Sequence, residues 1–470
     1  MAPPAERSTA IVWFRRDLRV HDQRALMHAL ERFERVLPMF VVDPAILEGR
    51  WPSANRRWFL DGALRSLRSE LEARGAPLLV VRGDPVDVIP RVAREVRAAA
   101  VVATRDLDPY GRRRDAQVAA ALHADNREFV AGRGQLVHEP ETVQRDGGGA
   151  FQVFSPFHRR WQQLPVRDLL PSPDEVRAPS ISGELADAAA TDPAALIGAT
   201  LPTADPAFLL EPSERAARGR LDRWARSPAL AAYATGRDRL DIDGTSRLSQ
   251  DLRWGLLSPA EVMHRTAGDG EGPVRFHSEL AWRDFYAHLL WHEPRVARHS
   301  FRSELESVAW SADAAALEAW QQGRTGYPVV DAAMRQLLAT GWMHNRARMI
   351  TASFLTKHLG VDWRVGEAHF MAHLVDGDPA SNNGGWQWAA STGTDPQPYF
   401  RVFNPTLQGR RHDPNGEYVR RWVPELAAVP GLAGGDVHEP PPGAYLSRIV
   451  DHVQARRQAL EAYGSARPSR

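Results

Sequence analysis

The sequence contains no cysteine among its 470 residues. That absence excludes disulfide scaffolds, thiolate zinc sites, cysteine-ligated iron–sulfur clusters and cysteine nucleophiles. Lysine is nearly absent as well, because Lys357 is the only one and all other basic residues are arginine. A phosphate-binding Gly-x-x-x-x-Gly-Lys loop needs glycine directly before lysine, whereas Thr356 precedes Lys357. The chain is therefore not a P-loop enzyme.

Long apolar runs and several common signatures are also missing. No run approaches the roughly 18 apolar residues of a membrane helix, and the start, Met1–Arg7, lacks the apolar segment of a secretion signal. No Gly-x-Gly-x-x-Gly motif follows the first expected strand, and no Gly-x-Ser-x-Gly nucleophile elbow occurs. The pairs His288/His292 and His369/His373 lack the glutamate of a His-Glu-x-x-His site. We expect a cytoplasmic protein without a metal.

The net charge of +1 gives by itself no indication of a nucleic-acid partner. The stretch from Arg335 to Arg364, however, holds five basic residues against a single acidic one, Asp362. A solvated helix face is the default interpretation of such a cluster. Aromatic residues lie among these charges, which keeps a nucleic-acid surface open as the alternative.

The first third of the chain alternates apolar, β-branched runs with helical stretches. It predicts strands at 10–14, 36–42, 78–81 and 100–103 and helices at 22–35, 56–74, 85–97 and 112–124. This alternation predicts a doubly wound α/β domain, a parallel sheet covered on both faces. Such sheets bind ligands beyond the carboxyl ends of their strands, so the turns Arg15–Asp17 and Arg105–Tyr110 are candidate ligand loops.

Residues 171–212 contain seven prolines and show weak periodicity, which predicts a long connection with one short helix. From about residue 213 the helical pattern continues, with no internal repeat. We therefore predict an α/β domain over 1–135, an interdomain linker over 136–212 and an all-α domain over 213–470.

The segment Asp376–Trp388 interleaves glycines, carboxamides and carboxylates with two tryptophans. Buried without partners, each polar group would cost about 1–3 kcal/mol. A polar ligand that supplies the partners resolves this conflict, although a plain loop stays open as the alternative. A calcium loop is not indicated, because Ala380 and Ser381 break the required ligand pattern.

Two further helical segments carry mixed polar and apolar faces. One face combines an amide, a guanidinium and a thioether, and the other a carboxyl, an indole and a guanidinium (Asn345, Arg348 and Met349; Glu279, Trp282 and Arg283). The second set suits stacking on a base and hydrogen bonding to its edge. A partly buried helix edge and a Glu–Arg helix pair are the plain alternatives.

These segments together resemble the photolyase/cryptochrome family, most closely the microbial class I cyclobutane pyrimidine dimer photolyases. The resemblance covers nearly the whole chain and is carried by several motifs in order (Trp13–Arg19, Gly244–Ser249, Glu279–Leu290, Thr325–Arg335, Asp376–Trp388 and Phe400–Pro405). It implies an N-terminal domain for an antenna chromophore and a helical catalytic domain that binds FAD in a folded conformation. The implied FAD-binding residues are Tyr233, Thr245, Ser246, Arg247, Leu248, Ser249, Glu279, Arg283, Asn345, Arg348, Asp376, Gly377, Asp378 and Asn382.

The resemblance also implies the reaction. Light-excited, reduced FAD passes an electron to a flipped-out pyrimidine dimer in UV-damaged DNA, the cyclobutane ring splits, and the electron returns. The implied catalytic residues are Glu279, Trp282, Asn345, Met349 and Asn382, and the implied DNA-binding residues are Arg237, Trp282, Asn345, Arg346 and Arg401. Trp310, Trp363 and Trp386 match the family's electron-transfer chain, although spacing alone does not show contact, since most tryptophans fill cores.

Particular positions separate the subfamilies. Relatives that repair (6-4) photoproducts place histidines where Asn345 and Met349 stand, and many cryptochromes replace the residue that matches Asn382 by Asp or Cys. Gln250 and Phe276 depart from residues found in some relatives, proline and tryptophan, without removing a catalytic group.

The resemblance implies an antenna site at Arg15, Asp106 and Tyr110. Folate-using relatives carry an Asn-Glu pair where this chain has Tyr110-Gly111. The resemblance therefore favours 8-hydroxy-5-deazaflavin as the second chromophore, with 5,10-methenyltetrahydrofolate or an empty site as the alternatives.

A cryptochrome-like blue-light photosensor is the alternative function. Only a few residues follow the expected helix near Asp451–Tyr463, which leaves no long signalling tail and favours the repair enzyme. We expect a bacterial, monomeric enzyme that is associated with the nucleoid when bound to DNA.

Overall fold

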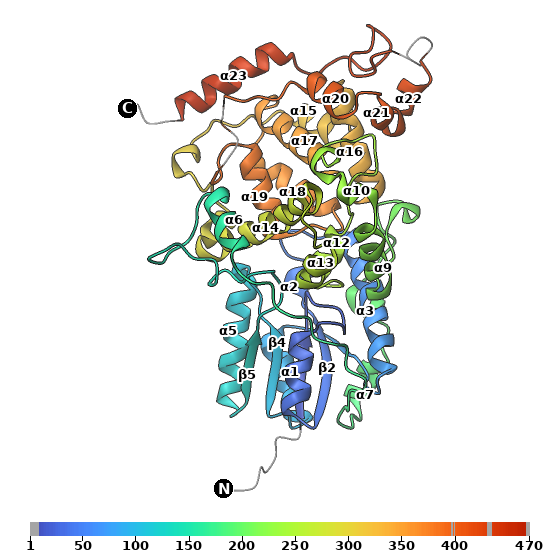
Figure 1. Ribbon diagram of the computed structural model, residues 1–470, viewed down its shortest axis with the longest axis vertical. Helices are drawn as coiled ribbons and strands as arrows, with labels where there is room; N and C mark the ends of the chain where they lie inside the picture. The colour runs from blue at the N-terminus through green and yellow to red at the C-terminus, as the bar shows by residue number, and fades with distance from the viewer. Residues whose placement is uncertain (1–8, 396–397, 399, 430–434, 467–470) are drawn as a thin grey trace.

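The computed structural model describes residues 9–395, 398, 400–429 and 435–466. The start of the chain, Met1–Arg7, on which the expectation of no secretion signal rests, lies outside the described residues. A parallel sheet with flanking helices forms one end of the molecule, and a helical domain forms the other (Figure 1). The predicted fold class, an α/β domain followed through a proline-rich connection by an all-α domain, is confirmed.

The sheet has five parallel strands in the order β3-β2-β1-β4-β5. They are β1 (Thr9–Phe14), β2 (Arg35–Val42), β3 (Leu79–Arg82), β4 (Ala100–Thr104) and β5 (Glu128–Gly132). The first four match the prediction to within one residue at each end. The prediction missed β5, because this edge strand is only half-buried and lacks the continuous apolar run of a central strand.

Side chains of the central strand alternate between two apolar layers. Ala10, Val12 and Phe14 pack in the layer with α1 (Arg24–Arg32) and α3 (Ala54–Glu72). Their neighbours in β1 pack in the layer with α4 (Pro85–Glu95) and α5 (Pro109–Ala124). A central parallel strand is buried on both faces in this way, which explains why its sequence is uniformly apolar.

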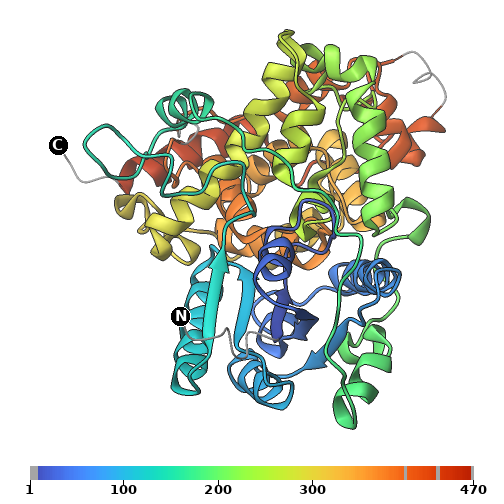
Figure 2. The ribbon, with the colours of Figure 1, turned by 60° about the horizontal axis from the view of Figure 1, so that its bottom comes forward.

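The connection between the domains holds more helix than predicted. It contains α6 (Phe154–Gln162), α7 (Glu184–Ala190), α8 (Pro193–Ile197) and a 3₁₀ turn at Pro206–Phe208. The expectation of one short helix over 171–212 was wrong, because proline at the first turn begins a helix instead of breaking it, with Asp192 capping α8 through the N–H of Ala194. The first part of the connection, with α6, packs against α14 (Glu271–His292) of the helical domain. The later part, with α7 and α8, runs along the outside of the α/β domain (Figure 2), where the Val36 N–H donates to the Arg177 carbonyl at 2.7 Å.

All regular elements in the described part of the C-terminal domain are helices or 3₁₀ turns. Its α-helices are α9 (Glu214–Ala225), α10 (Pro228–Ala231), α11 (Tyr233–Gly236), α12 (Ser249–Trp254), α13 (Pro259–Arg265), α14 (Glu271–His292), α15 (Ala314–Gln321), α16 (Pro328–Thr340), α17 (Asn345–Lys357), α18 (Trp363–His373), α19 (Pro379–Ala389), α20 (Pro405–His412), α21 (Glu417–Trp422), α22 (Pro424–Ala427) and α23 (His452–Ser465). Two 3₁₀ turns lie at Pro294–Ala297 and Ser303–Leu305, and α2 (Pro44–Leu47) precedes α3 in the first domain. Within the described ranges, none of these helices is both long enough and apolar enough to cross a membrane.

The first turn of α3 caps the end of α18 across the domain boundary. Asn55 is fully buried, and its amide donates to the His373 carbonyl at 2.6 Å while its oxygen accepts from the Ala204 N–H at 3.0 Å. Arg56 donates to the Met371 carbonyl. The last carbonyls of a helix have no partner within the helix, so this contact satisfies them with side chains from the other domain.

A second junction joins the turn after β1 to the end of α12. Gly255 has φ +68°, and a side chain there would meet the backbone of Arg16 and Asp17. The Leu18 N–H donates to the Trp254 carbonyl at 3.2 Å. Only glycine fits both the left-handed conformation and this close approach. The carboxyl end of β1 is thereby held against the helical domain.

We predict that Asn55→Ala lowers the free energy of unfolding by about 2–4 kcal/mol. The substitution leaves the buried Ala204 N–H and the part-buried His373 carbonyl without the Asn55 side chain, and an unpaired buried group costs about 1–3 kcal/mol. Urea unfolding followed by circular dichroism measures the change. The matched control is Asn415→Ala at an exposed position, which should shift the midpoint little; equal shifts in both variants would contradict the role of the cap.

Candidate functional site

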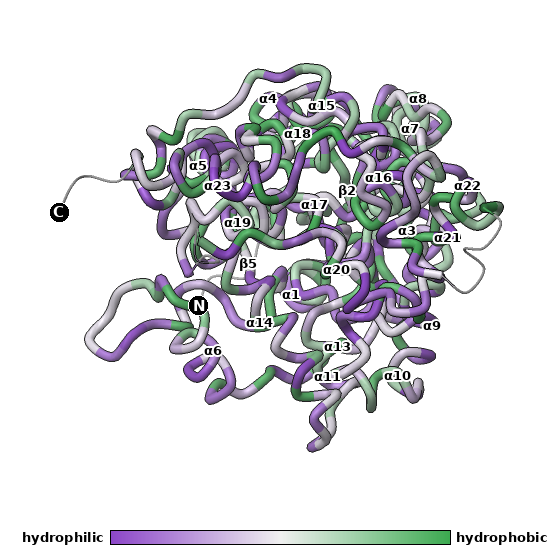
Figure 3. The backbone as a smooth tube through the Cα atoms, turned by 90° about the horizontal axis from the view of Figure 1, so that it is seen from above, coloured by the Kyte–Doolittle hydropathy of each residue, from purple (hydrophilic) through white to green (hydrophobic). Residues whose placement is uncertain are grey.

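A cavity of about 540 Å³ opens in the helical domain. Seen from the helical end of the molecule (Figure 3), α11 and α14 lie on one side and α17 and α19 on the other, and lining residues come from both sets. Its volume lies within the roughly 300–1,000 Å³ typical of cofactor sites. The predicted residues that line it are Tyr233, Arg237, Thr245, Ser246, Arg247, Leu248, Ser249, Glu279, Trp282, Arg283, Asn345, Arg346, Arg348, Met349, Asp376, Gly377, Asp378, Asn382 and Trp386.

An ion pair between α17 and the segment before α19 forms part of the cavity wall. Arg348 donates through Nη2 to Asp376 Oδ2 at 2.8 Å and through Nε to the Met343 carbonyl at 2.8 Å. The other carboxylate oxygen of Asp376, Oδ1, is buried and has no hydrogen-bond partner in the described part of the chain. A buried acceptor without a partner is costly, so this oxygen is suited to receive a donor from a ligand.

Asp378 connects α19 to the α/β domain. Its Oδ1 caps the helix by accepting from the N–H groups of Ala380 and Ser381, at 3.1 and 2.9 Å, and its Oδ2 accepts from Arg16. Burial alone would raise the pKa of this carboxyl. The positive charges of Arg16, Arg253 and Arg283 outweigh burial and hold the pKa well below its usual range. The carboxylate is therefore ionised throughout the physiological range.

The structure adds Arg253, which the sequence analysis missed, to this cluster. Its Nε donates to the Gly377 carbonyl at 2.8 Å, and its Nη1 is buried with no partner among the described residues. Burial and, secondarily, the neighbouring Arg16 lower its pKa to about 9. Arg253 lies on the short helix that directly follows the Thr245–Ser249 motif, and this proximity is the signal that could have identified it. The cavity wall thus offers an unused cationic donor.

The loop at 245–249 reaches the cavity in an unusual conformation. Arg247 has φ +52°, in the left-handed region that non-glycine residues rarely adopt. Its guanidinium lies over the ring of Trp342, 4.6 Å from the ring centroid. Trp342 also lines the cavity and was not predicted as a site residue. The cation–π contact contributes to holding the loop in this shape.

A buried polar network fixes the amide of Asn382. Its Nδ2 donates to the Glu367 carbonyl at 3.1 Å, while the Glu367 carboxylate accepts from Asn383 Nδ2 at 2.9 Å and from Arg50 at 3.1 Å. Burial raises the pKa of Glu367 to about 7. This hydrogen bond uses one of the two N–H donors of the amide, and the amide of Asn382 lines the cavity in a fixed orientation.

The rim of the cavity gathers the predicted lesion-binding side chains. Trp282 stacks on Phe154 of α6, with ring centroids 3.7 Å apart and planes at 8°, so one face of the indole is covered. Glu279 pairs with Arg237. Burial raises the pKa of the Glu279 carboxyl, against the opposing effect of Arg237 and Arg275.

Asn345 Nδ2 lies 3.9 Å from Met349 Sδ, so these two residues share one face of α17, as their spacing predicts. Both line the cavity together with Glu279 and Trp282. The four predicted lesion-binding side chains therefore line one opening, although two come from α14 and two from α17.

The three candidate electron-transfer tryptophans lie at different depths. Trp386 is buried and lines the cavity, Trp363 is fully buried at the first residue of α18, and Trp310 is partly buried beside Tyr463. Gly366 of α18 gives room to the Trp386 indole, which a Cβ at that position would overlap. A glycine in α18 thus sets the position of the tryptophan at the cavity wall.

The basic stretch 335–364 does not form one phosphate-binding surface. Lys357 is buried, and burial lowers its pKa to about 7. Arg335 pairs with Glu425 at 2.7 Å, and Arg364 pairs with Asp362 at 3.1 Å. Among the predicted DNA contacts, Arg346 lines the cavity, whereas the exposed Arg401 lies outside its lining.

The candidate antenna residues lie in a packed charge cluster at the ends of β1 and β4. Arg15 Nη1 lies 2.5 Å from Asp115 Oδ1 and 4.0 Å from Asp106 Oδ2. The Tyr110 hydroxyl donates to Asp43 at 2.6 Å. Burial disfavours ionised Asp106, but Arg15 and Arg114 hold its pKa below the usual range. The structure therefore brings the three predicted residues into one neighbourhood where they bond to protein partners.

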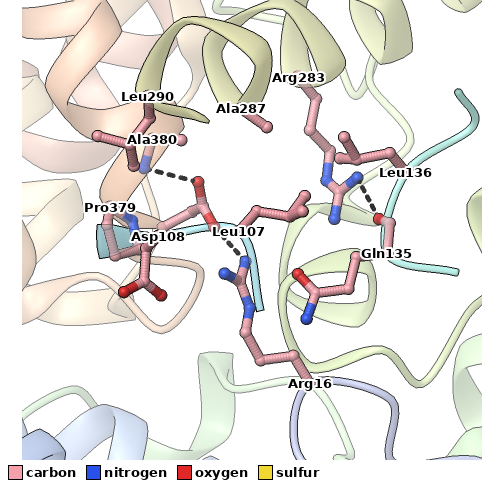
Figure 4. Close-up of a pocket in the computed structure, with 11 residues that line it drawn as sticks. Arg16, Leu107, Asp108, Gln135, Leu136, Arg283, Ala287, Leu290, Pro379 and Ala380 are labelled. Carbon is pink, nitrogen blue, oxygen red and sulfur yellow. Dashed lines mark hydrogen bonds and ion pairs between the residues drawn. The ribbon is translucent and has the colours of Figure 1, made fainter. Parts of the chain in front are cut away.

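A second, small cavity of about 20 Å³ lies where the two domains meet. Arg16, Asp108, Gln135 and Arg283 line it from both domains (Figure 4). Arg283 Nη1 donates to the Gln135 carbonyl at 2.8 Å. The space is about that of one water molecule, so the domains are in close contact here.

Fold and site together define a two-domain protein in which an all-α domain, packed against a parallel-sheet domain, holds a cofactor-sized, arginine-rich cavity. Residues 10–177 match the DNA photolyase family, and residues 276–465 match the FAD binding domain of DNA photolyase. A deoxyribodipyrimidine photo-lyase of Synechococcus sp. is 39% identical, with 96% of each chain covered. The chain therefore belongs to the DNA photolyase family.

Solved structures agree with this assignment. A class III photolyase from Agrobacterium tumefaciens has a TM-score of 0.89 at 36% identity, with 99% of each chain covered. A cryptochrome of Synechocystis sp. has a TM-score of 0.86 at 27% identity, covering 97% of this chain and 99% of that one.

The residues present fit FAD, because its imide N–H and diphosphate match the unpartnered Asp376 Oδ1 and Arg253 Nη1 in charge and polarity.

We predict that Gly366→Ala lowers the free energy of unfolding by about 1–3 kcal/mol, because the added methyl group overlaps the Trp386 indole and Leu355. Urea unfolding, with tryptophan fluorescence as the readout, measures the loss. Gly464→Ala is the control, since that helical position has nothing within 4 Å of the added carbon. It should be neutral or stabilising by up to about 1 kcal/mol, and a similar loss in both variants would contradict the packing argument.

Proposed function

We propose that this protein repairs cyclobutane pyrimidine dimers in DNA by light-driven electron transfer, with FAD held in the cavity of the helical domain. One observation carries the proposal: a single cavity joins an arginine-rich wall to a rim that presents a carboxyl, an amide, a thioether and an indole (Glu279, Asn345, Met349 and Trp282). The names of the similar photo-lyases support the same reaction.

The cavity wall binds and tunes the cofactor. Bound FAD, in its reduced anionic form, supplies the photoexcited electron that splits the cyclobutane ring and takes it back, so no net redox change occurs. Arg348, fixed by Asp376, places a permanent positive charge that favours an anionic ligand. Asn382 presents a neutral amide, which does not readily donate a proton. Tyr233 and residues 245–249 hold the remaining polar parts of the cofactor.

The rim receives the lesion. The damaged pair has to leave the duplex, which costs a few kcal/mol and costs least for a badly stacked base. The uncovered face of Trp282 stacks on the extruded pyrimidines, while Asn345 and Met349 contact their edges. Glu279 is held in place by Arg237, and its carboxylate is suited to accept a hydrogen bond from a pyrimidine N–H. This fit explains why the protein would bind damaged DNA in preference to intact DNA.

Other residues supply the electron path and the DNA backbone contacts. Trp386, which lines the cavity, would pass an electron to a bound flavin, and Trp363 and Trp310, which lie outside the lining, would extend that path. Arg237, Arg346 and Arg401 bind phosphates, which position the strand without reading its sequence.

The remaining assignments extend the proposal. Arg15, Asp106 and Tyr110 hold a second chromophore, 8-hydroxy-5-deazaflavin, with 5,10-methenyltetrahydrofolate or an empty site as the other outcomes of a spectrum of released chromophores. The α/β domain spans 1–135, the linker 136–212 and the catalytic domain 213–470. The enzyme acts as a monomer in the cytoplasm, on the nucleoid when bound to DNA.

The direct test uses purified, reduced protein and DNA that contains cyclobutane thymine dimers. Loss of dimers under blue light, but not in darkness, supports the proposal. A bound flavin that photoreduces without dimer loss would instead favour a photosensor, the function suggested by the structural similarity to a cryptochrome.

We predict that Trp282→Ala weakens binding to dimer-containing DNA by roughly 5- to 150-fold, because base stacking contributes about 1–3 kcal/mol. Flavin content and affinity for undamaged DNA should change little. Fluorescence anisotropy with matched damaged and undamaged duplexes measures both affinities, and absorbance measures the flavin. Equal loss of flavin and of lesion binding would assign Trp282 a structural role.

A further inference from the structure

A carboxylate that no step above uses lies between two arginines of the cavity wall. Asp238 directly follows Arg237 in the chain, just beyond α11. Arg346, at the start of α17, contacts it through two nitrogens, Nε to Oδ1 at 3.3 Å and Nη2 to Oδ2 at 2.7 Å. Arg237 Nε lies 3.6 Å from the same Oδ1. Asp238 itself is not part of the cavity lining.

The contacts leave one terminal nitrogen of each arginine free for a ligand. Arg346 uses Nε and Nη2 for Asp238, and Arg237 uses Nη1 for Glu279 and approaches Asp238 with Nε. Arg346 Nη1 and Arg237 Nη2 make no hydrogen bond to any residue that the structure describes. The arginine side chains are only 16% and 12% exposed, against 35% for Asp238, so both guanidiniums are held in fixed orientations.

We propose that Asp238 is a positioning residue that holds Arg237 and Arg346 as a preformed pair for a phosphate of the damaged strand. The inference rests on the proposed function, because it needs DNA at the rim. Long arginine side chains lose rotamer freedom when they bind a phosphate. Asp238 already restricts the rotamers of both arginines in the free protein. Less rotamer entropy is therefore lost when the arginines bind DNA.

The direction in which Asp238→Asn changes the affinity for DNA distinguishes this role from a simple charge effect. Asp238 is a negative charge close to the path of DNA, so electrostatics alone predicts that its removal strengthens binding. Loss of preorganisation predicts weaker binding. Asparagine keeps the size of the side chain but loses the ionic, two-point contact with Arg346.

We expect Asp238→Asn to weaken binding of a dimer-containing duplex about five- to tenfold, a value within the range of coupling between contacting residues. Anisotropy titrations in the dark at constant salt give the affinities. Asp243→Asn is the matched control, since it removes the same charge from an exposed side chain nearby, and it should bind equally well or slightly better. Asp238→Glu, which keeps the charge, should restore part of the loss.

A double-mutant cycle tests whether Asp238 acts through its partner. With Arg346→Ala as background, adding Asp238→Asn should cause a clearly smaller loss of affinity than in the wild type, because only Arg237 is left for Asp238 to position. Flavin content and the unfolding midpoint, measured on every variant, should stay at the wild-type values, which excludes a merely structural effect.

Three results would overturn the inference. They are tighter or unchanged binding in Asp238→Asn, a loss that adds in full to that of Arg346→Ala, and a parallel loss of flavin. If the wild-type protein shows no preference for the dimer, the proposed function and this inference both fail. If the wild type prefers the dimer and Asp238→Asn binds like it, only the inference fails.

Discussion

The balance of charge at the start of α19 is the constraint on which the remaining structure depends. Asp378 caps this helix and is ionised, because the arginines around it outweigh the cost of its burial. Those arginines come from the turn after β1, from α12 and from α14, which lie far apart in the sequence. Burying one charge without the others would be strongly destabilising. The same charge cluster therefore connects the cavity wall to the domain junction.

This shared cluster explains why the α/β domain matters to a cavity that lies in the helical domain. Arg16 reaches Asp378 from the turn after β1, and Arg50 reaches the Glu367 network that orients Asn382. Asn55 and Arg56 cap the helix that carries Gly366 and Trp363. The first domain thus fixes the backbone and side-chain geometry of the cavity wall.

Much of the site could be predicted from the sequence, because its residues carry polarity that a core does not explain. The mixture of amides, carboxylates and indoles over Asp376–Trp388 indicates a ligand, and the spacing of Asn345 and Met349 places them on one helix face. Arg253 and Trp342 could not be found in this way. Trp342 is a common residue in an ordinary loop, and for Arg253 the only local signal is its position directly after the Thr245–Ser249 motif. The folded chain brings both residues to the cavity.

By itself the sequence determined the class of fold, the order of the first four strands along the chain and the chemistry of the side chains available. Periodicity and composition are local properties, so a single chain displays them before it folds. Tertiary structure decided the rest: that the basic stretch 335–364 divides into separate ion pairs, that Lys357 is buried, and that Asp238 joins two arginines. These outcomes depend on which groups meet across long sequence separations, where burial and pairing set the free energy of each charge.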